Sequence, residues 1–407
     1  MSEKQKKIFK IIIISLAVFL VAEIIFFGIR YYNNRKSNTF YSVISGAIQT
    51  EKGYIGAGLS DYRYSDFNEY DGGYQKPTIF VNENGKLTNE ISLDLGYNGY
   101  FNDIIKVKDG YIAVGGLEMT KAQNKDMESE GIIVKYDKNF KLVWRQNLNV
   151  IGKTEFTKVK IDKDNNVIVV GSSIYPSGFM GNHKTGGGIL VKYNQEGKKL
   201  LQINNGGPYA GRFNDVVIEN DGYVVVGLGQ KNSGIIIKYD KKGKKVWDSS
   251  YGYTDEKGIM AIEKYDNKYI TATTKVVSKE DLSTYQASIV VFDTKGNKLD
   301  NVKYSSNKIT AFTDVKVING EIYACGHTGK KVNNQLVSDA IIVKYDKELY
   351  EENVDILKGD NNDFYNNIYE KDKKVLVLGY SNSDIKEYDL NGYDYSPFIK
   401  EYTNKLK

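Results

Sequence analysis

Short runs of Val, Ile and Tyr alternate with turn residues along most of this chain, and four such runs recur in each repeating segment. The stretch FNDIIKVKDGYIAVGG at 101–116, followed by GIIVKYDKNFKLVWRQNL at 131–148, contains all four runs. β-Branched and aromatic residues in short runs, bounded by Gly, Asn and Asp, are typical of strands joined by tight turns. We therefore expect four antiparallel strands per segment.

Two sequence markers show how often the segment repeats. The residue after the aromatic of "VKYD" recurs as Asn82, Asp137, Asn194, Asp240, Asp293, Asp346 and Thr403. A second marker ends the second run, as Gly58, Gly115, Gly171, Gly227, Thr273, Gly326 and Gly379. Both markers count seven repeats of about 50 residues, and four-stranded repeats that bury their faces on their neighbours form propellers. The expected fold is all-β, a seven-bladed β-propeller of four-stranded antiparallel blades over residues 40–407.

Tight turns connect the runs within each repeat. KDG at 108–110 and NDG at 220–222 join first and second runs, and we expect Asn or Asp with Gly to supply the positive φ of a hairpin there. DKNFK, NQEGK, DKKGK, DTKGN and NENGK join third and fourth runs.

The segments VKYDKNFKLVW (134–144) and IKYDKKGKKVW (237–247) resemble the repeat of the pyrroloquinoline-quinone-type propeller superfamily. In that repeat an Asp, a turn Gly and an outer-strand Trp recur in each blade. The Trp is kept as Trp144 and Trp247, whereas Leu201 and Asp300 stand in its place in the third and fifth repeats. The resemblance implies the fold, and the superfamily includes both quinone-dependent dehydrogenases and non-catalytic propellers. The quinone enzymes are expected to carry adjacent cysteines and a calcium-bound cofactor site, so the single cysteine, Cys325, favours the non-catalytic branch. No cofactor is therefore expected.

The seventh repeat stops at PFIKEYTNKLK, after its third run, so closure of the ring needs an explanation. Residues 36–41, KSNTFY, precede the first run and are one candidate for the missing outer strand. The alternative is a three-stranded final blade. An open edge would otherwise be free to pair with other chains.

The amino terminus predicts a single transmembrane helix. A basic tail at 1–10 is followed at 11–30 by IIIISLAVFLVAEIIFFGIR, in which Glu23 is the one acidic residue, and a linker at 31–39 follows. An apolar run of this length nearly spans a hydrocarbon core of about 30 Å. A cleaved signal peptide is the alternative. The lysines of the tail favour a cytoplasmic amino terminus, which places the propeller outside the cytoplasm at the cell membrane.

Composition narrows the possible partners. The 407 residues include 56 basic and 51 acidic ones, and the net charge of +5 is spread along the chain, so nucleic-acid binding is not expected. Cys325 is the only cysteine, which excludes an intramolecular disulfide and a cysteine-rich metal site. Frequent Lys, Ile, Asn and Tyr are typical of a bacterial protein from an AT-rich genome.

The loops between second and third runs carry the candidate binding site. They are the long connections of each repeat, and long loops on a rigid scaffold commonly hold binding residues. Three are rich in aromatic residues, at 61–74, 172–187 and 381–396. Tyrosine offers a large contact area for a protein or glycan, although packing among the loops is the alternative. The candidate residues are Tyr62, Tyr64, Phe67, Tyr70, Tyr74, Tyr175, His183, Tyr388, Tyr393 and Tyr395.

Other candidates for chemistry are weaker. DKDNN at 162–166 and DLNGYD at 389–394 resemble calcium loops without completing the pattern, and the first aligns with hairpin turns of other repeats. His327 follows a marker glycine, with no nucleophile or carboxylate cluster nearby in the sequence. Cys325 is expected to be a buried small residue of a strand.

Asp103, Asp215 and Asp314 recur in FND, FND and FTD at the start of first runs. Carboxylates around a central channel could bind a cation or act as acid and base. Because several repeats share the residue, we expect instead that it caps a loop through backbone hydrogen bonds.

These patterns predict a membrane-anchored, extracytoplasmic binding or scaffold module, without catalytic activity, for an envelope protein or a surface polymer. The alternative is an enzyme that acts on an envelope glycan or small molecule, with Asp66, Asp71 and Asp394 at the mouth of the propeller. Two carboxyl groups about 5–10 Å apart in a pocket would favour the enzyme.

Overall fold

A computed structural model describes residues 42–60, 75–118, 129–150, 152–174, 186–205, 211–229, 232–252, 254–277, 285–304, 309–332, 335–359, 362–381 and 396–402. These residues all belong to one compact part of the chain. The predicted anchor at 11–30 and the linker at 31–39 lie outside them. Within the described residues no helix has the length and apolar character that a membrane crossing requires.

Strands make up most of the described chain, and their order follows the predicted repeats. The first repeat contains β1 (Ser42–Gln49), β2 (Gly53–Ser60), β3 (Lys76–Glu83) and β4 (Lys86–Ser92). The second contains β5 (Asn98–Val107), β6 (Gly110–Glu118), β7 (Ser129–Asp137) and β8 (Leu142–Leu148). The third contains β9 (Lys153–Ile161), β10 (Val167–Ile174), β11 (Gly186–Tyr193) and β12 (Lys199–Asn204).

The remaining strands continue this order. The fourth repeat contains β13 (Arg212–Ile218), β14 (Gly222–Leu228), β15 (Gly234–Asp240) and β16 (Lys245–Tyr251). The fifth contains β17 (Thr254–Tyr265), β18 (Lys268–Val276), β19 (Tyr285–Asp293) and β20 (Lys298–Lys303). The sixth contains β21 (Ile309–Ile318), β22 (Glu321–Val332), β23 (Gln335–Tyr345) and β24 (Glu351–Leu357), and the last contains β25 (Asp363–Lys371), β26 (Lys374–Ser381) and β27 (Ser396–Tyr402).

Each repeat is an antiparallel meander in which consecutive strands pair. The second and third repeats join into one eight-stranded sheet through a single parallel pair, Ser129 with Lys153. The last sheet has three described strands, β25, β26 and β27. Residues 36–41, the candidate for its fourth strand, lie outside the described residues, so the closing-strand prediction is not tested.

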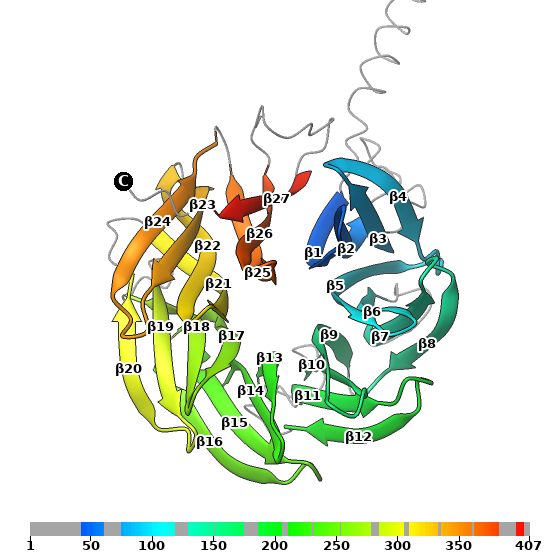
Figure 1. The fold of residues 1–407 in the computed structure, drawn as a ribbon. Helices are drawn as coiled ribbons and strands as arrows, with labels where there is room; N and C mark the ends of the chain where they lie inside the picture. Colours follow the sequence, from blue (N-terminus) through cyan, green and yellow to red (C-terminus); the bar gives the residue numbers. More distant parts are fainter. Residues whose placement is uncertain are drawn as a thin grey trace, which may run out of the picture. The chain divides into compact units, whose positions relative to one another are not determined.

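The sheets pack face to face around a central axis, in the arrangement of a β-propeller. First strands of successive repeats contact one another, and β25 contacts β1, so the order returns to its start. Figure 1 shows β1, β5, β9, β13 and β25 toward the middle, with β4, β8, β12, β16 and β20 at the periphery. Buried apolar clusters lie between neighbouring sheets, because alternate strand residues face each neighbour.

Every first strand contains a β-bulge at the same place. In β5 the register shifts between Phe101 and Asp103, and the marker glycine of β6, Gly115, faces this bulge. A Cβ on Gly115 would lie 1.9 Å from the carbonyl oxygen of Tyr100, so only glycine fits there. The fifth repeat has Thr273 instead, and there the strand opposite has Gly258 with a φ of 78°.

The predicted positive φ at the KDG and NDG turns is wrong. Neither Gly110 nor Gly222 has a positive φ. A Cβ on either residue would lie 1.9 Å from a third-strand carbonyl oxygen, that of Tyr136 or Tyr239 respectively. These glycines are therefore required by close strand approach and not by turn conformation.

The repeated Asp of "VKYD" shapes the turn between third and fourth strands. Asp137 Oδ1 accepts hydrogen bonds from the backbone N–H of Asn139 at 2.8 Å and of Lys141 at 2.9 Å. Asn194, Asp240, Asp293 and Asp346 make the same pair of bonds. A side chain that accepts from the backbone two residues on is an Asx turn, which explains the residue type at this position.

Candidate functional site

The predicted aromatic site falls outside the described residues. This applies to all of its members, Tyr62, Tyr64, Phe67, Tyr70, Tyr74, Tyr175, His183, Tyr388, Tyr393 and Tyr395. It applies equally to Asp66, Asp71 and Asp394 of the enzyme alternative and to the possible calcium loop at 389–394. These predictions stand untested, and the site geometry below comes from the strands and their short turns.

Recurring polar residues on the first strands connect neighbouring sheets. The bulge residue Asn102 donates from Nδ2 to the carbonyl oxygen of Phe156 at 2.8 Å. The next residue, Asp103, accepts at Oδ2 from the backbone N–H of Val159 at 3.0 Å. Both partners lie on β9, so one dipeptide of β5 holds the next first strand by two bonds. We call such a dipeptide an inter-sheet clamp.

Two further clamps repeat this geometry. Asn214 Nδ2 donates to Ile259 O at 2.8 Å, and Asp215 Oδ2 accepts from Ile262 N at 3.1 Å. Thr313 Oγ1 donates to Tyr365 O at 2.7 Å, and Asp314 Oδ2 accepts from Ile368 N at 2.8 Å. The clamps thus join the second repeat to the third, the fourth to the fifth and the sixth to the seventh.

The prediction that these aspartates cap loops through backbone hydrogen bonds is confirmed for the bonds and wrong for the loops. They do accept backbone hydrogen bonds, as expected. They do not cap loops, because the bulge places each carboxylate within a strand and turns it toward the neighbouring sheet. Asp103, Asp215 and Asp314 are between 4% and 6% exposed, and buried polar groups of this kind need such partners.

Lysines on the same inner strands complete a charged cluster. Lys160 Nζ lies 2.8 Å from Asp215 Oδ1, and Lys158 Nζ lies 3.7 Å from Asp103 Oδ2. Lys316 Nζ lies 2.8 Å from Glu263 Oε2. Each of these three ion pairs joins first strands of neighbouring repeats across a sheet boundary.

Burial and neighbouring charge act against each other on these carboxyl groups. Burial would raise the pKa of Asp215, but the charges of Lys160, Lys158 and Lys316 outweigh it and hold that pKa below its usual value. For Asp314, burial dominates over nearby lysines and raises the pKa. Burial likewise raises the pKa of Asp103. Members of one cluster therefore differ in how readily they stay ionised.

The first and last sheets meet at a seam with its own contacts. Tyr369 Oη accepts a hydrogen bond from the backbone N–H of Ala47 at 3.0 Å. Ala47 aligns with Val159, the donor to Asp103, but the acceptor Tyr369 lies two residues beyond Asn367, which holds the register position of the clamp aspartate. Lys371 Nζ donates to the carbonyl oxygen of Thr50 at 2.9 Å. Burial, followed by the charge of Asp103, raises the pKa of Tyr369, so this phenol stays neutral.

His327 and Cys325 occupy packing positions. The His327 ring is 5% exposed and makes edge contacts with Tyr285 and Phe364, at centroid distances of 6.4 and 5.0 Å. Cys325 is fully buried within β22, as predicted, and burial raises the pKa of its thiol well above the ordinary value.

The DKDNN segment is a hairpin turn. Asp162 Oδ1 accepts from the backbone N–H of Asp164 at 2.9 Å and of Asn166 at 2.8 Å, while Lys192 Nζ lies 2.8 Å from its Oδ2. Across the part of the chain that the structure describes, no group of three or more His, Cys, Asp or Glu side chains could hold a metal ion.

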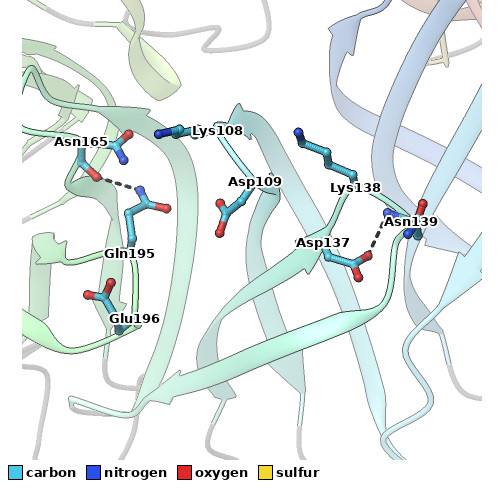
Figure 2. A pocket seen from close by; sticks show the side chains of 8 residues that line it. All are labelled: Lys108, Asp109, Asp137, Lys138, Asn139, Asn165, Gln195 and Glu196. Carbon is cyan, nitrogen blue, oxygen red and sulfur yellow. Dashed lines mark hydrogen bonds between the residues drawn. The ribbon is translucent and has the colours of Figure 1, made fainter.

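The rim formed by the short turns contains hollows that sequence reasoning missed. A hollow of about 630 Å³ lies between the turns of the second and third repeats. Figure 2 shows its eight lining side chains, Lys108, Asp109, Asp137, Lys138, Asn139, Asn165, Gln195 and Glu196. We expected sites on the opposite rim because these turns are short, but grooves form between turns of neighbouring repeats.

Trp144 and Lys135 fill the floor of this groove. Trp144 Nε1 donates to the carbonyl oxygen of Gln195 at 2.9 Å, and Lys135 Nζ donates to the same oxygen at 3.2 Å and to Asp109 Oδ2 at 2.9 Å. A Cβ on Gly197 would lie 3.0 Å from the Trp144 ring, so the indole packs on the turn glycine. Trp247 packs on Gly296 in the same way.

The equivalent groove between the fifth and sixth repeats is hollow at its floor. It encloses about 500 Å³ and is lined by Tyr265, Asp266, Lys268, Ile270, Val291, Leu299, Asp300, Lys347, Glu348 and Leu349. Strand register aligns Val291 with Lys135 and Asp300 with Trp144. The residues that fill the other groove are therefore replaced here by a smaller apolar residue and a carboxylate.

Comparisons with known proteins add little beyond the fold. No family model matches the sequence, and no curated protein matches it. Among solved structures, the Dos1 propeller is 12% identical, with a TM-score of 0.44, 84% of this chain covered and 91% of that one. The propeller domain of the Trilobed protease from Pyrococcus furiosus is 12% identical, with a TM-score of 0.42, covering 76% and 82%. Lignostilbene dioxygenase from Pseudomonas brassicacearum is 10% identical, with a TM-score of 0.47, covering 90% of each chain.

Proposed function

We propose that this chain is a seven-bladed propeller that acts as a binding or scaffold module, without catalytic activity of its own. Its target is an envelope protein or a surface polymer. The clamps are the observation that carries this proposal. The buried carboxylates nearest the axis, which an enzyme could have used as acid or base, are bonded to the backbone of the next sheet and paired with lysines.

The blade count follows if each repeat is one blade. The eight-stranded sheet then contributes two blades, since a single parallel pair joins its halves, and β25–β27 contribute the last. A matching bulge in every first strand supports this count.

Membership of the pyrroloquinoline-quinone-type superfamily, in its non-catalytic branch, is also part of the proposal. The supporting contacts are the Asx turn made by the repeated Asp, and the packing of Trp144 on Gly197 and of Trp247 on Gly296. These are the three residue types on which the sequence resemblance rests.

Location and anchoring are proposed from the sequence. Residues 11–30 form a single membrane-spanning anchor, and the propeller lies on the extracytoplasmic side of the cell membrane. Second strands end, and third strands begin, on the rim opposite the short turns, and a partner binds there through the aromatic residues of the loops that follow the second strands.

A capture experiment tests the proposal. The full chain in mild detergent serves as bait for solubilised envelope proteins and for purified surface polymers, beside a variant with Tyr62, Tyr64, Tyr393 and Tyr395 changed to Ala. Tyr350→Ala is the matched control, because Tyr350 is 71% exposed on the turn rim. We expect a partner that the wild type and the control retain and the quadruple variant loses.

Two results would count against the proposal. Capture that ignores all four tyrosines would remove the loop site. Turnover of an envelope glycan that disappears on changing Asp66, Asp71 or Asp394 would favour the enzyme alternative instead.

A further inference from the structure

We propose that the groove between the fifth and sixth repeats binds a tryptophan side chain of a partner polypeptide. The site lies on the turn rim and is separate from the loop site of the proposed function, so either can fail alone. The inference starts from a comparison of this groove with the others in the same molecule.

Aromatic side chains occupy three of the equivalent grooves. Trp144 fills the floor of the groove between the second and third repeats, and Trp247 packs in the same way between the fourth and fifth. Between the first and second repeats the Trp position is Asn89, and the turn glycine is replaced by Phe140, which stacks on Tyr111 at a centroid distance of 5.0 Å. The aromatic ring of a groove is thus supplied either by the fourth strand of one repeat or by the third-to-fourth turn of the next repeat.

The groove between the fifth and sixth repeats lacks that ring. Asp300 stands at the Trp position, and Leu349 stands at the glycine position with a φ of 69°. Leu349 is 8% exposed and packs into the apolar cluster, as Phe140 does in its own groove, but its side chain is smaller. Val291 replaces the lysine as well. The hollow above Trp144 is lined by polar turn residues alone, whereas the cleft here, of about 500 Å³, reaches the buried strand residues Ile270 and Val291 and is within the size range of binding pockets.

The cleft has the chemistry that an indole requires. Its floor is apolar, from Ile270, Val291 and Leu349. In the filled groove the carbonyl oxygen of Gln195 accepts bonds from Trp144 and Lys135. The aligned carbonyl here belongs to Lys347, and neither of those two donors exists in this groove. An inserted indole N–H can use that carbonyl or the Asp300 carboxylate.

A polypeptide is the better source of this indole than a free small molecule. Both indoles in filled grooves are presented by an outer strand, β8 or β16, so the groove accepts a ring that enters from an extended chain. Charges of both signs, on Asp266, Lys268, Lys347 and Glu348, surround the mouth and suit the charged neighbours of a peptide tryptophan. Leu299, which is 53% exposed, offers an apolar edge at the same mouth.

Fluorine NMR of a labelled probe tests the site without interference from Trp144 and Trp247. N-Acetyl-5-fluorotryptophan amide is titrated with the full chain in mild detergent. We expect saturable line broadening and at least tenfold weaker binding to the D300W/L349G variant, in which an internal tryptophan and glycine reconstitute the filled groove. Asp248→Trp is the matched control, since it adds an exposed tryptophan to β16 beside Trp247, and it should bind as the wild type does.

Competition separates the two sources of indole. A short peptide with one Trp, one Lys and one Glu should displace the probe at lower concentration than free indole does. The proposal is overturned by unsaturable broadening, by equal binding to D300W/L349G, or by free indole competing better than the peptide. If D300W/L349G does not fold, Leu299→Glu replaces it, and unchanged probe binding by that variant also overturns the proposal.

Discussion

Replacing Asp215 by Ala tests whether the clamps hold the sheets together. The change removes the acceptor for Val216 N at 2.7 Å and for Ile262 N at 3.1 Å, and the partner of Lys160 at 2.8 Å. A buried donor left without a partner costs about 1–3 kcal/mol. Lys160 keeps its bond to the carbonyl oxygen of Val216 and stays 23% exposed, so its charge adds less than a fully buried one would. We therefore expect a loss of about 3–5 kcal/mol in the free energy of unfolding.

The assay is urea unfolding of the full chain, followed by circular dichroism and tryptophan fluorescence, with midpoints compared at a common slope. Asp215→Asn keeps one acceptor oxygen and should lose about half as much. Asp248→Asn is the control, since Asp248 and Lys245 form an exposed pair at 2.9 Å that contributes less than about 1 kcal/mol. If Asp215→Ala unfolds within about 1 kcal/mol of that control, the clamps do not stabilise the fold.

The pH dependence of the same variant gives a second readout. The pKa of Asp215 is lowered in the folded state, whereas an unfolded Asp has a pKa of about 3.9. Its stabilising contribution is therefore present above the unfolded value and is lost as the pH falls through the folded pKa. The difference between wild type and Asp215→Ala should persist from neutral pH down to about pH 4 and shrink below it. A difference that disappears by pH 6 would refute the assigned charge state.

Three further predictions concern the clamps and the turns. Burial raises the pKa of Asp314, so the stability that its carboxyl contributes is present below the unfolded pKa and is lost as the pH rises through the folded pKa. We therefore expect Asp314→Asn to destabilise the fold less than Asp215→Asn at pH 7, as measured by urea midpoints. Gly296→Ala should lower the free energy of unfolding by about 2–4 kcal/mol, and Gly85→Ala by about 1 kcal/mol. Both glycines have a positive φ, but only a Cβ on Gly296 would meet a neighbour, the Trp247 ring at 2.6 Å, so equal losses in thermal unfolding would contradict this reasoning. Phe140→Gly should be more stable than Phe140→Ala by about 1 kcal/mol. Both variants lose the stacking on Tyr111, but only glycine adopts the φ of 62° at this position without strain. The reverse order of stability in urea would exclude backbone strain at this turn.

The repeat could be predicted because its strongest signals are local. Strand residues, the Asx-turn Asp and the bulge-facing glycine lie within one repeat, so a single sequence contains them all. The NDG turn shows where local reasoning fails. A glycine at position 222 can be required by a positive φ or by the close approach of a neighbouring carbonyl oxygen. The residues around it in the sequence are the same for both reasons, so the sequence cannot distinguish them.

Contacts between repeats were harder to predict. The FND and FTD motifs are visible in the sequence, but Val159, whose N–H bonds to Asp103, lies 56 residues further along the chain. Only the geometry of the bulge shows which strand the carboxylate reaches. The hollow groove depends on two positions in different repeats, Asp300 and Leu349. The loss of Trp at 300 was visible in the sequence, whereas its pairing with a non-glycine turn residue needed the strand register. The aromatic loop residues lie outside the described residues, so their prediction stands on sequence alone.

The seam between β25 and β1 has a consequence for how the chain folds. A clamp joins residues about one repeat apart, 56 positions in the case of Asp103 and Val159, while the bond from Ala47 to Tyr369 spans 322 positions. Because the entropy of loop closure grows only with the logarithm of loop length, the seam costs about 1.5 kcal/mol more to close than a clamp. Repeats can therefore assemble one after another through short-range contacts, and the ring can close last at a modest entropic cost. The same seam, with the contacts of longest sequence separation, is where we expect the folded ring to open first.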